Sequence, residues 1–197
     1  KRKVGEIRSV RYDGSNFGDE VTALSADSHL SYPFVFEHEG KTCFIPEHSE
    51  ARDVSAFEIN EHGRAVSKRT IFARSEMVDA TFLQWSGRFW AFALLEGQTQ
   101  NTELHIFFSD DLWGAWQPHK LNPVKMDIST ARPAGTPFVH DGVLYRPAQD
   151  CGPNYGSAIT INRVETLSES EYEEHCVTRV IPQAGSAFSY GIHTISS

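Results

Sequence analysis

Short apolar runs that alternate with polar residues dominate the chain, which is the pattern of β-strands with one buried face. Three stretches share one layout of an apolar strand, a turn that ends in glycine and a second apolar strand: 33–45, 81–92 and 137–145. The three turns are Glu39-Gly40, Ser86-Gly87 and Asp141-Gly142. Because glycine takes a positive φ without a Cβ clash, each stretch is predicted to form a β-hairpin.

Each hairpin is followed by two further strand candidates with alternating or β-branched residues. The third strands are predicted at 54–59, 103–108 and 157–162, and the fourth strands at 67–73, 116–121 and 175–181. Four strands in a repeat of about 50 residues is typical of a β-propeller blade. The blades are predicted at about 29–75, 79–125 and 132–183. A two-layer sandwich of hairpins is the alternative, but a sandwich need not repeat its strands at this period.

The ends of the chain extend this pattern, and helix is scarce. Residues 4–11 are predicted as an outer strand of an earlier blade and 191–197 as the opening strand of a later one, with 168–174 a short helix or turn. Three blades plus partial blades would leave open strand edges, since propellers have about four to eight blades. We therefore expect 1–197 to be a single all-β propeller domain that is part of a longer protein or self-associates through its edges.

Composition excludes several classes of protein. With 26 acidic and 18 basic residues the net charge is −8, which argues against a nucleic-acid binder. No apolar run approaches the ~20 residues that span a bilayer. The three cysteines lack the spacing of a disulfide framework or a zinc site, and no cofactor motif occurs, so no metal or cofactor is expected. No signal-peptide pattern is present, and a soluble, cytoplasmic placement is favoured without being fixed.

Several motifs together resemble one family. They are HLSYPFVF at 29–36, IPE at 45–47, VDAT at 78–81, ARPAG at 131–135, LYRPAQDC at 144–151, YG at 155–156 and GIHT at 191–194. The set resembles the five-bladed propeller domain at the N-terminus of glucosamine inositolphosphorylceramide transferases, which is itself similar to glycoside hydrolase family 43. The resemblance covers nearly the whole chain. It implies that the chain begins in the first blade and stops just inside the fifth.

The innermost strand of each propeller blade lines a central channel, and ligands bind where several blades converge at one mouth. Polar residues recur just before these strands: His29 and Tyr32 in one blade, Asp79 and Thr81 in the next, Arg132 in the third and His193 in a fourth. They share one blade position, so we expect them to face a common point and contact a ligand.

Two carboxylates, Asp79 and Glu47, are the candidates for catalysis. Glycoside hydrolysis commonly needs one carboxylic acid and a second carboxylate, and family 43 enzymes take three acidic residues from separate blades. Where such enzymes place an Asp before the Pro, this chain reads Ser31-Tyr32-Pro33. The alternatives are a turn-capping role for Asp79 and a solvated strand-end position for Glu47.

Other polar groups suit sugar or anion recognition. Arg132 and Arg146 offer planar forks for a carboxylate or phosphate, or they form salt bridges with Asp79 or Asp150 inside the propeller. Gln149 and Asp150 with Tyr155 could line a carbohydrate pocket, or form a satisfied core network. His29 and His193 could act as acid, base or metal ligand, although a single histidine is more often structural.

The function predicted from these residues is a glycoside-hydrolase-like, carbohydrate-binding propeller that acts on a glycosidic bond or serves a glycosyltransferase. The alternative is a non-catalytic module for glycan or glycolipid-headgroup recognition or for assembly. The expected partners are a carbohydrate or glycolipid headgroup and a fused or associated glycosyltransferase.

Overall fold

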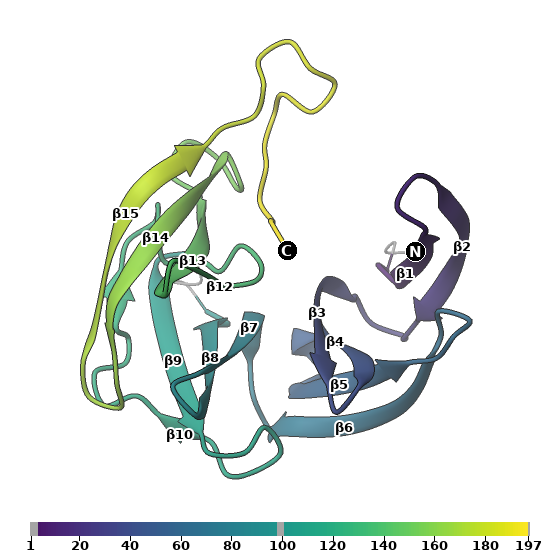
Figure 1. Cartoon of the computed structure of the whole chain (residues 1–197), viewed down its shortest axis with the longest axis horizontal. Coiled ribbons are helices and arrows are strands. Elements are labelled where there is room, and N and C mark those ends of the chain that lie inside the picture. Colours follow the sequence, from purple (N-terminus) through teal and green to yellow (C-terminus); the bar gives the residue numbers. More distant parts are fainter. Residues whose placement is uncertain (1–3, 98–100, 197) are drawn as a thin grey trace. The chain divides into compact units, whose positions relative to one another are not determined.

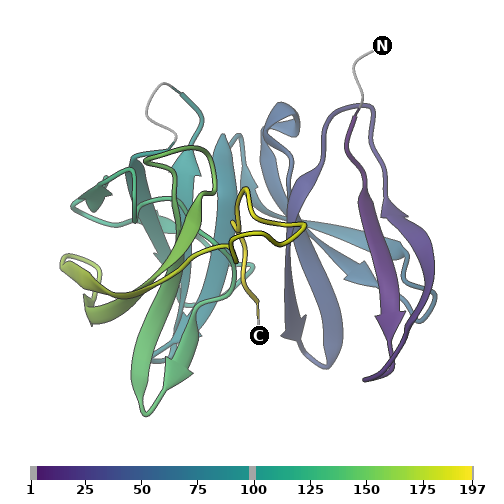
Figure 2. The ribbon, with the colours of Figure 1, turned by 90° about the horizontal axis from the view of Figure 1, so that it is seen from above.

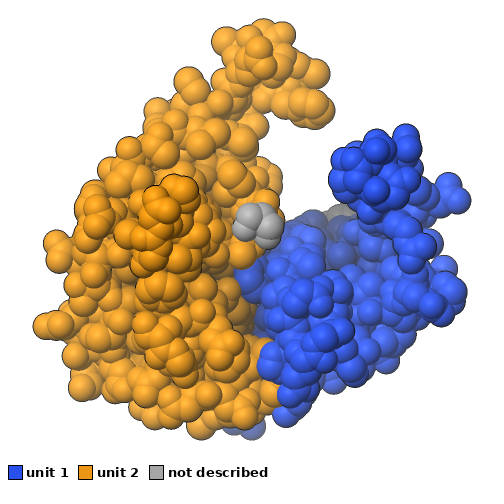
Figure 3. Space-filling model, in the orientation of Figure 1, with its two compact units in different colours: residues 1–77 blue, residues 78–197 orange. Residues whose placement is uncertain are grey.

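The computed structural model describes residues 4–97 and 101–196. The chain divides into two compact units, residues 1–77 and 78–197 (Figure 3).

Unit 1 contains a two-stranded and a four-stranded antiparallel sheet. Its strands are β1 (Ile7–Tyr12), β2 (Phe17–Leu24), β3 (Ser31–His38), β4 (Lys41–Glu47), β5 (Asp53–Ile59) and β6 (Ala65–Ala73), with the 3-10 helix η1 (Ser49–Ala51) after β4. The larger sheet has the order β3-β4-β5-β6, as predicted for a blade, and β1 pairs with β2. Phe44 and Leu30 of this unit pack with Ile7 of β1 in one buried cluster.

Unit 2 contains two sheets that run in chain order (Figure 1). The first comprises β7 (Met77–Trp85), β8 (Arg88–Leu95), β9 (Glu103–Ser109), β10 (Gln117–Pro118) and β11 (Lys125–Met126), which also pairs with β9. The second comprises β12 (Phe138–His140), β13 (Val143–Asp150), β14 (Ala158–Leu167) and β15 (Tyr172–Val180). Phe92, Leu104 and Ile106 are fully buried in the core of the first sheet, and Ile159 is fully buried in that of the second.

The three predicted hairpin turns are confirmed. At each turn both central residues have positive φ: 50° and 73° at Glu39-Gly40, 51° and 78° at Ser86-Gly87, and 50° and 76° at Asp141-Gly142. Two consecutive positive φ angles define the type I′ turn, whose twist matches that of the flanking strands. Turn chemistry in the sequence was therefore sufficient to locate the hairpins.

The fourth strand predicted at 116–121 is reduced to the two residues of β10. After β10, the side-chain amide of Asn122 makes the hydrogen bonds to β9 that the backbone of a longer strand would make. The Asn122 amide donates to the Ile106 carbonyl (Nδ2–O 2.7 Å) and accepts from the Ile106 N–H (N–Oδ1 2.8 Å). This satisfies both backbone groups of Ile106 without a longer ladder.

Residues 168–174 form a bend and the start of β15, not a short helix. The Ser168 hydroxyl oxygen accepts a hydrogen bond from the Glu171 N–H (2.9 Å), which reverses the chain directly after β14. Such local side-chain bonds compete with helix formation.

An opening strand is predicted at 191–197, of which Ser197 lies outside the described residues; 191–196 is an extended segment with one parallel bridge, between Ile195 and Gly135, among the described residues. It runs beside 134–136 (Figures 1 and 2), where the Ile195 N–H donates to the Ala134 carbonyl (2.8 Å) and the Thr136 N–H donates to the Ile195 carbonyl (3.1 Å). This pairing brings His193 next to Gly156, where an added Cβ would lie 2.6 Å from the His193 Cβ.

Within the described ranges 4–97 and 101–196, no helix has the length and apolar character needed to cross a bilayer.

Candidate functional site

Asp79 lies near the start of β7 in an unusual backbone conformation. Its φ is 51°, in the left-handed region that non-glycine residues rarely occupy, although aspartate tolerates it better than most. The side chain is buried, and the Thr81 hydroxyl donates to the Asp79 carbonyl (3.3 Å). Such outliers persist where the surroundings hold them, and they concentrate at functional sites.

The Asp79 carboxylate is the acceptor for groups from two distant segments. Oδ2 accepts from Arg132 Nε (2.7 Å) and from Gln149 Nε2 (3.2 Å). Arg132 also donates through Nη1 to Asn101 Oδ1 (2.7 Å). The side chains of Asp79 and Arg132 are only 4% and 9% exposed, so this is a buried ion pair. The structure thus realises the salt-bridge alternative between Arg132 and Asp79.

Tyr155 covers the other side of the Arg132 guanidinium. The guanidinium carbon lies 4.9 Å from the Tyr155 ring centroid, within the range of a cation–π contact. The His193 ring is tilted against the Tyr155 ring at 5.8 Å. Partial burial raises the pKa of the Tyr155 hydroxyl, which opposes the effect of the Arg132 charge. Tyr155 is nevertheless 56% exposed, so part of its ring faces solvent.

Gln149 leaves one polar atom without a partner. Its Nε2 donates to Asp79 Oδ2 and to the Pro133 carbonyl (3.0 Å), and these two acceptors fix the orientation of the amide. The residue is fully buried, and Oε1 has no hydrogen-bond partner in the part of the chain that the structure describes. A buried carbonyl oxygen without a donor is costly, by about 1–3 kcal/mol. We call Asp79, Asn101, Arg132, Gln149 and Tyr155 the Asp79 cluster.

The remaining predicted residues of unit 2 are engaged elsewhere. Asp150 accepts from the Gly152 N–H (2.9 Å) and is ion-paired with Arg179 (2.6 Å). Thr81 is buried and supports the backbone of Asp79. The guanidinium of Arg146 is buried and bonded wholly within the protein, so we do not assign it to ligand contact.

Three predicted residues belong to unit 1, and His29 and Glu47 have partners within it. His29 Nδ1 accepts from the Gly5 N–H (3.0 Å). Glu47 accepts from the Ser31 hydroxyl (2.8 Å) and, through its other oxygen, from a backbone N–H (3.0 Å). Tyr32 has a φ of 42°, which resembles Asp79 at the corresponding blade position. Their convergence with the Asp79 cluster stays a prediction.

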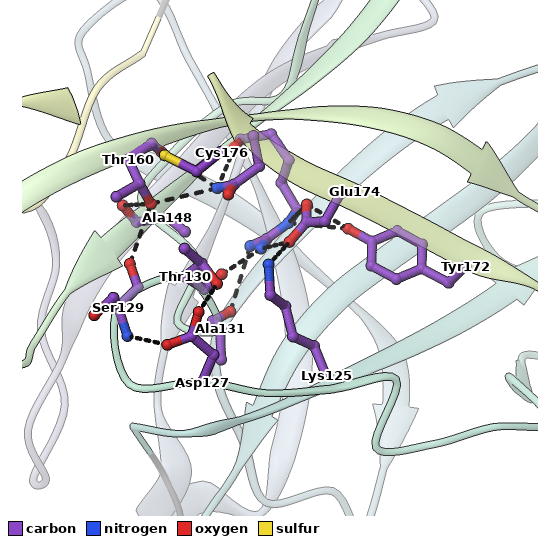
Figure 4. Close-up of polar contacts among 12 residues, drawn as sticks. Lys125, Asp127, Ser129, Thr130, Ala131, Ala148, Thr160, Tyr172, Glu174 and Cys176 are labelled. Atoms are coloured by element: carbon purple, nitrogen blue, oxygen red, sulfur yellow. Dashed lines mark hydrogen bonds and ion pairs between the residues drawn. The ribbon is translucent and has the colours of Figure 1, made fainter. Parts of the chain in front are cut away.

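A second buried polar group surrounds Glu174 of β15. Figure 4 shows Lys125 and Tyr172 pointing at the Glu174 carboxylate, at 2.9 Å and 2.6 Å. Arg146 bonds the same carboxylate with Nε (2.9 Å) and Nη2 (2.5 Å). Neither Glu174 nor Asn101 lies in a distinctive sequence motif, so sequence reasoning selected neither of them.

Burial would raise the pKa of the Glu174 carboxyl, but the charges and hydrogen bonds of Arg146, Lys125 and Tyr172 together outweigh it and hold this pKa below its ordinary value. Burial also raises the pKa of the Tyr172 hydroxyl, well above its usual range. The carboxylate form of Glu174 is therefore the form that the fold stabilises.

The lowered pKa of Glu174 predicts that part of the free energy of unfolding is lost at acid pH. A carboxyl whose pKa is lower in the folded chain stabilises the fold above its unfolded pKa of about 4.3, and this stabilisation is lost as the pH falls below it. Urea unfolding between pH 3 and pH 7 should show a steeper acid loss in the wild type than in Arg146→Met/Glu174→Met. Identical pH profiles for the two proteins would contradict the assignment.

Comparison with known proteins identifies close relatives. The sequence profile described as glucosamine inositolphosphorylceramide transferase 1, N-terminal, matches residues 4–188. Glucosamine inositolphosphorylceramide transferase 1 of Arabidopsis thaliana is 35% identical over 177 residues, which is 87% of this chain and 23% of that protein. The protein of the same name from Oryza sativa subsp. japonica is 33% identical over 92% of this chain and 25% of its own length. The chain thus spans about a quarter of these relatives.

Solved structures show the same fold at low sequence identity. An exo-β-1,3-galactanase from Clostridium thermocellum has a TM-score of 0.64 and 14% identity, over 88% of this chain and 43% of that chain. An α-L-arabinanase from Cellvibrio cellulosa has a TM-score of 0.55 and 13% identity, over 93% and 68%. The predicted all-β, five-bladed-propeller type of fold, similar to glycoside hydrolase family 43, is confirmed.

Proposed function

Since the chain belongs to the family of the N-terminal domain of glucosamine inositolphosphorylceramide transferase 1, we propose that its Asp79 cluster binds the hydroxyl-rich ring of a glycolipid headgroup for a glycosyltransferase. The class of lipid, inositolphosphorylceramide, is taken from the name of the relatives. The side chains that would contact the headgroup are those of the Asp79 cluster. Glycosyl transfer itself would belong to another part of the protein or to a partner.

The observation that carries this proposal is Gln149 Oε1, which has no hydrogen-bond partner among the described residues, while the amide nitrogen of the same side chain is held by the carboxylate that binds Arg132. Oε1 is enclosed by protein atoms, so a ring hydroxyl can donate to it only after the half-exposed Tyr155 side chain beside it moves. The exposed part of the Tyr155 ring offers a flat apolar surface. Fixed polar groups beside an aromatic face are the usual means of recognising a sugar.

The charge of the cluster favours an uncharged ring over a bare phosphate. Arg132 and Asp79 form an ion pair at 2.7 Å, so the guanidinium is already neutralised. Its Nη1 is also occupied by Asn101. An anion would have to compete with Asp79 for the guanidinium, whereas a hydroxyl would pair with Gln149 Oε1, for which no other donor among the described residues competes.

The same contacts favour recognition over hydrolysis. A general acid must carry a proton to give to the leaving oxygen. Asp79 Oδ2 accepts two hydrogen bonds, one of them from a guanidinium, so this oxygen is engaged as an acceptor and is not placed to donate a proton. The oxygens of Glu47, the other catalytic candidate, likewise accept hydrogen bonds.

Replacement of Tyr155 by alanine tests the proposal with little risk to the fold, because the side chain is half exposed. Saturation-transfer NMR with myo-inositol 1-phosphate and with glucosamine should detect binding to the wild type. Tyr155→Ala should weaken it about tenfold, equivalent to ~1.4 kcal/mol. Tyr12→Ala is the matched control, since Tyr12 is 57% exposed and lies on the β1–β2 hairpin.

Two results would contradict the proposal. One is a wild type that transfers no saturation to either compound. The other is a Tyr155→Ala protein that binds as tightly as the wild type and the Tyr12→Ala control.

A further inference from the structure

The segment that leads into Arg132 is fastened by a fully buried arginine. Arg146 on β13 is 1% exposed. Its Nη1 donates to the Ala131 carbonyl (3.3 Å) and its Nη2 to the Thr130 carbonyl (2.5 Å). These are the carbonyls of the two residues that precede Arg132, so one guanidinium fixes two consecutive peptide units.

Arg146 is itself held in a single orientation by Glu174. The two carboxylate oxygens accept from Nε and Nη2, which forms a bidentate fork. Tyr172 and Lys125 donate to the same carboxylate (Figure 4). Because Arg146, Tyr172 and Lys125 all bond the Glu174 carboxylate, this carboxylate is held in place. The Arg146 guanidinium bonded to it therefore has little freedom to rotate away from the two carbonyls.

The residues after Arg132 are fastened to the same strand. The Gln149 N–H donates to the Arg132 carbonyl (2.8 Å), and the Ala134 N–H donates to the Pro147 carbonyl (3.2 Å). The backbone is thus fixed on both sides of Arg132, by a side chain before it and by β13 after it. Its side chain leaves this anchored stretch toward Asp79.

We propose that the Arg146–Glu174 pair is a positioning device for the Asp79 cluster. It fixes the peptide units of Thr130 and Ala131 and thereby the direction in which the Arg132 side chain leaves the backbone. A buried ion pair often adds little net stability compared with an apolar pair of similar size, but it demands one geometry. Binding groups depend on such a supporting layer, because small displacements weaken contacts strongly.

The effect on ligand binding depends on the proposed function, whereas the effect on Arg132 does not. The experiment therefore first measures Arg132 itself. In Arg146→Met/Glu174→Met, solvent exchange of the Arg132 Nε–H, followed by ¹⁵N NMR and assigned by its loss in Arg132→Lys, should be at least tenfold faster than in the wild type. Leu144→Ala is the control, since Leu144 is a buried apolar residue on the same strand.

Affinity for myo-inositol 1-phosphate, measured by the same NMR method, supplies the second readout. The double replacement should weaken binding about tenfold in the wild-type background and not at all in an Arg132→Ala background, because the pair acts through Arg132. The loss of thermal stability should be equal in both backgrounds. A merely structural pair would not produce this difference.

Unchanged exchange of the Arg132 Nε–H would overturn the proposal, and so would equally fast exchange in Leu144→Ala. If exchange rises but the wild type binds no probe, the positioning role stands and the proposed function fails. Should the double variant not fold, Arg146→Lys gives the same test. A lysine keeps a charge for Glu174 but lacks the planar fork that reaches both carbonyls.

Discussion

Gly135→Ala is expected to detach the segment 191–195 from 134–136 and to lower the free energy of unfolding by about 3–5 kcal/mol. Gly135 has a φ of 109°, which an alanine adopts only with strain. Its added Cβ would lie 1.8 Å from the Ile195 carbonyl oxygen and 2.7 Å from the Ile195 carbonyl carbon. Both are backbone atoms and cannot rotate away, so the bridge between the two segments must open.

Urea unfolding and hydrogen exchange of the Ile195 amide measure this effect. Gly142→Ala is the matched control: its φ is 76°, and no heavy atom of the described residues lies within 4 Å of the added Cβ. It should cost only the positive-φ strain of about 1–2 kcal/mol. Equal destabilisation by both replacements would show that the close approach to Ile195 is not what requires glycine at position 135.

Glu174→Leu is expected to lower the free energy of unfolding by about 3–5 kcal/mol, because it leaves Arg146 buried without its counter-charge. An arginine cannot escape this cost by losing its proton. The Arg146 side chain is 2% exposed, so it cannot reach water either. Arg146→Met/Glu174→Met removes both charges and should recover most of the loss, as measured by urea unfolding.

The comparison with an exposed pair makes this prediction specific. Lys41 and Glu58 form an ion pair at 2.8 Å in unit 1, with side chains 58% and 29% exposed. Glu58→Leu should therefore cost less than about 1 kcal/mol. If Glu174→Leu were as mild, or if the double replacement were as harmful as the single one, burial of the Arg146–Glu174 pair would not account for its energetics.

The Asp79 cluster illustrates how far sequence reasoning could go. Four of its five residues were selected from the sequence as candidates, and an ion pair between Arg132 and Asp79 was one stated alternative. The choice between that pair and a free, ligand-facing arginine depended on a distance between residues 53 positions apart. Asn101 was missed because a single amide beside a strand carries no pattern.

Arg146 shows the opposite case. An arginine was predicted to bind an anion through two of its N–H groups. Arg146 does so, but the anion is the carboxylate of Glu174 in the same chain. Glu174 follows Glu173 at the start of β15, where the first four residues alternate in exposure, and which of the two is buried depends on the strand register and on what packs against that face. The sequence therefore indicated that Arg146 binds an anion, but it did not indicate that this anion is Glu174.

The sequence by itself determined the hairpins and the order of the sheets, because a type I′ turn and period-two alternation are properties of neighbouring residues. Only the tertiary structure decided which polar side chains are buried together, where the segment 191–195 pairs, and that Arg146 bonds Glu174 and the carbonyls of Thr130 and Ala131. Those outcomes depend on contacts between residues far apart in the chain. Each also depends on the balance between losing water and gaining a partner, which no local pattern encodes.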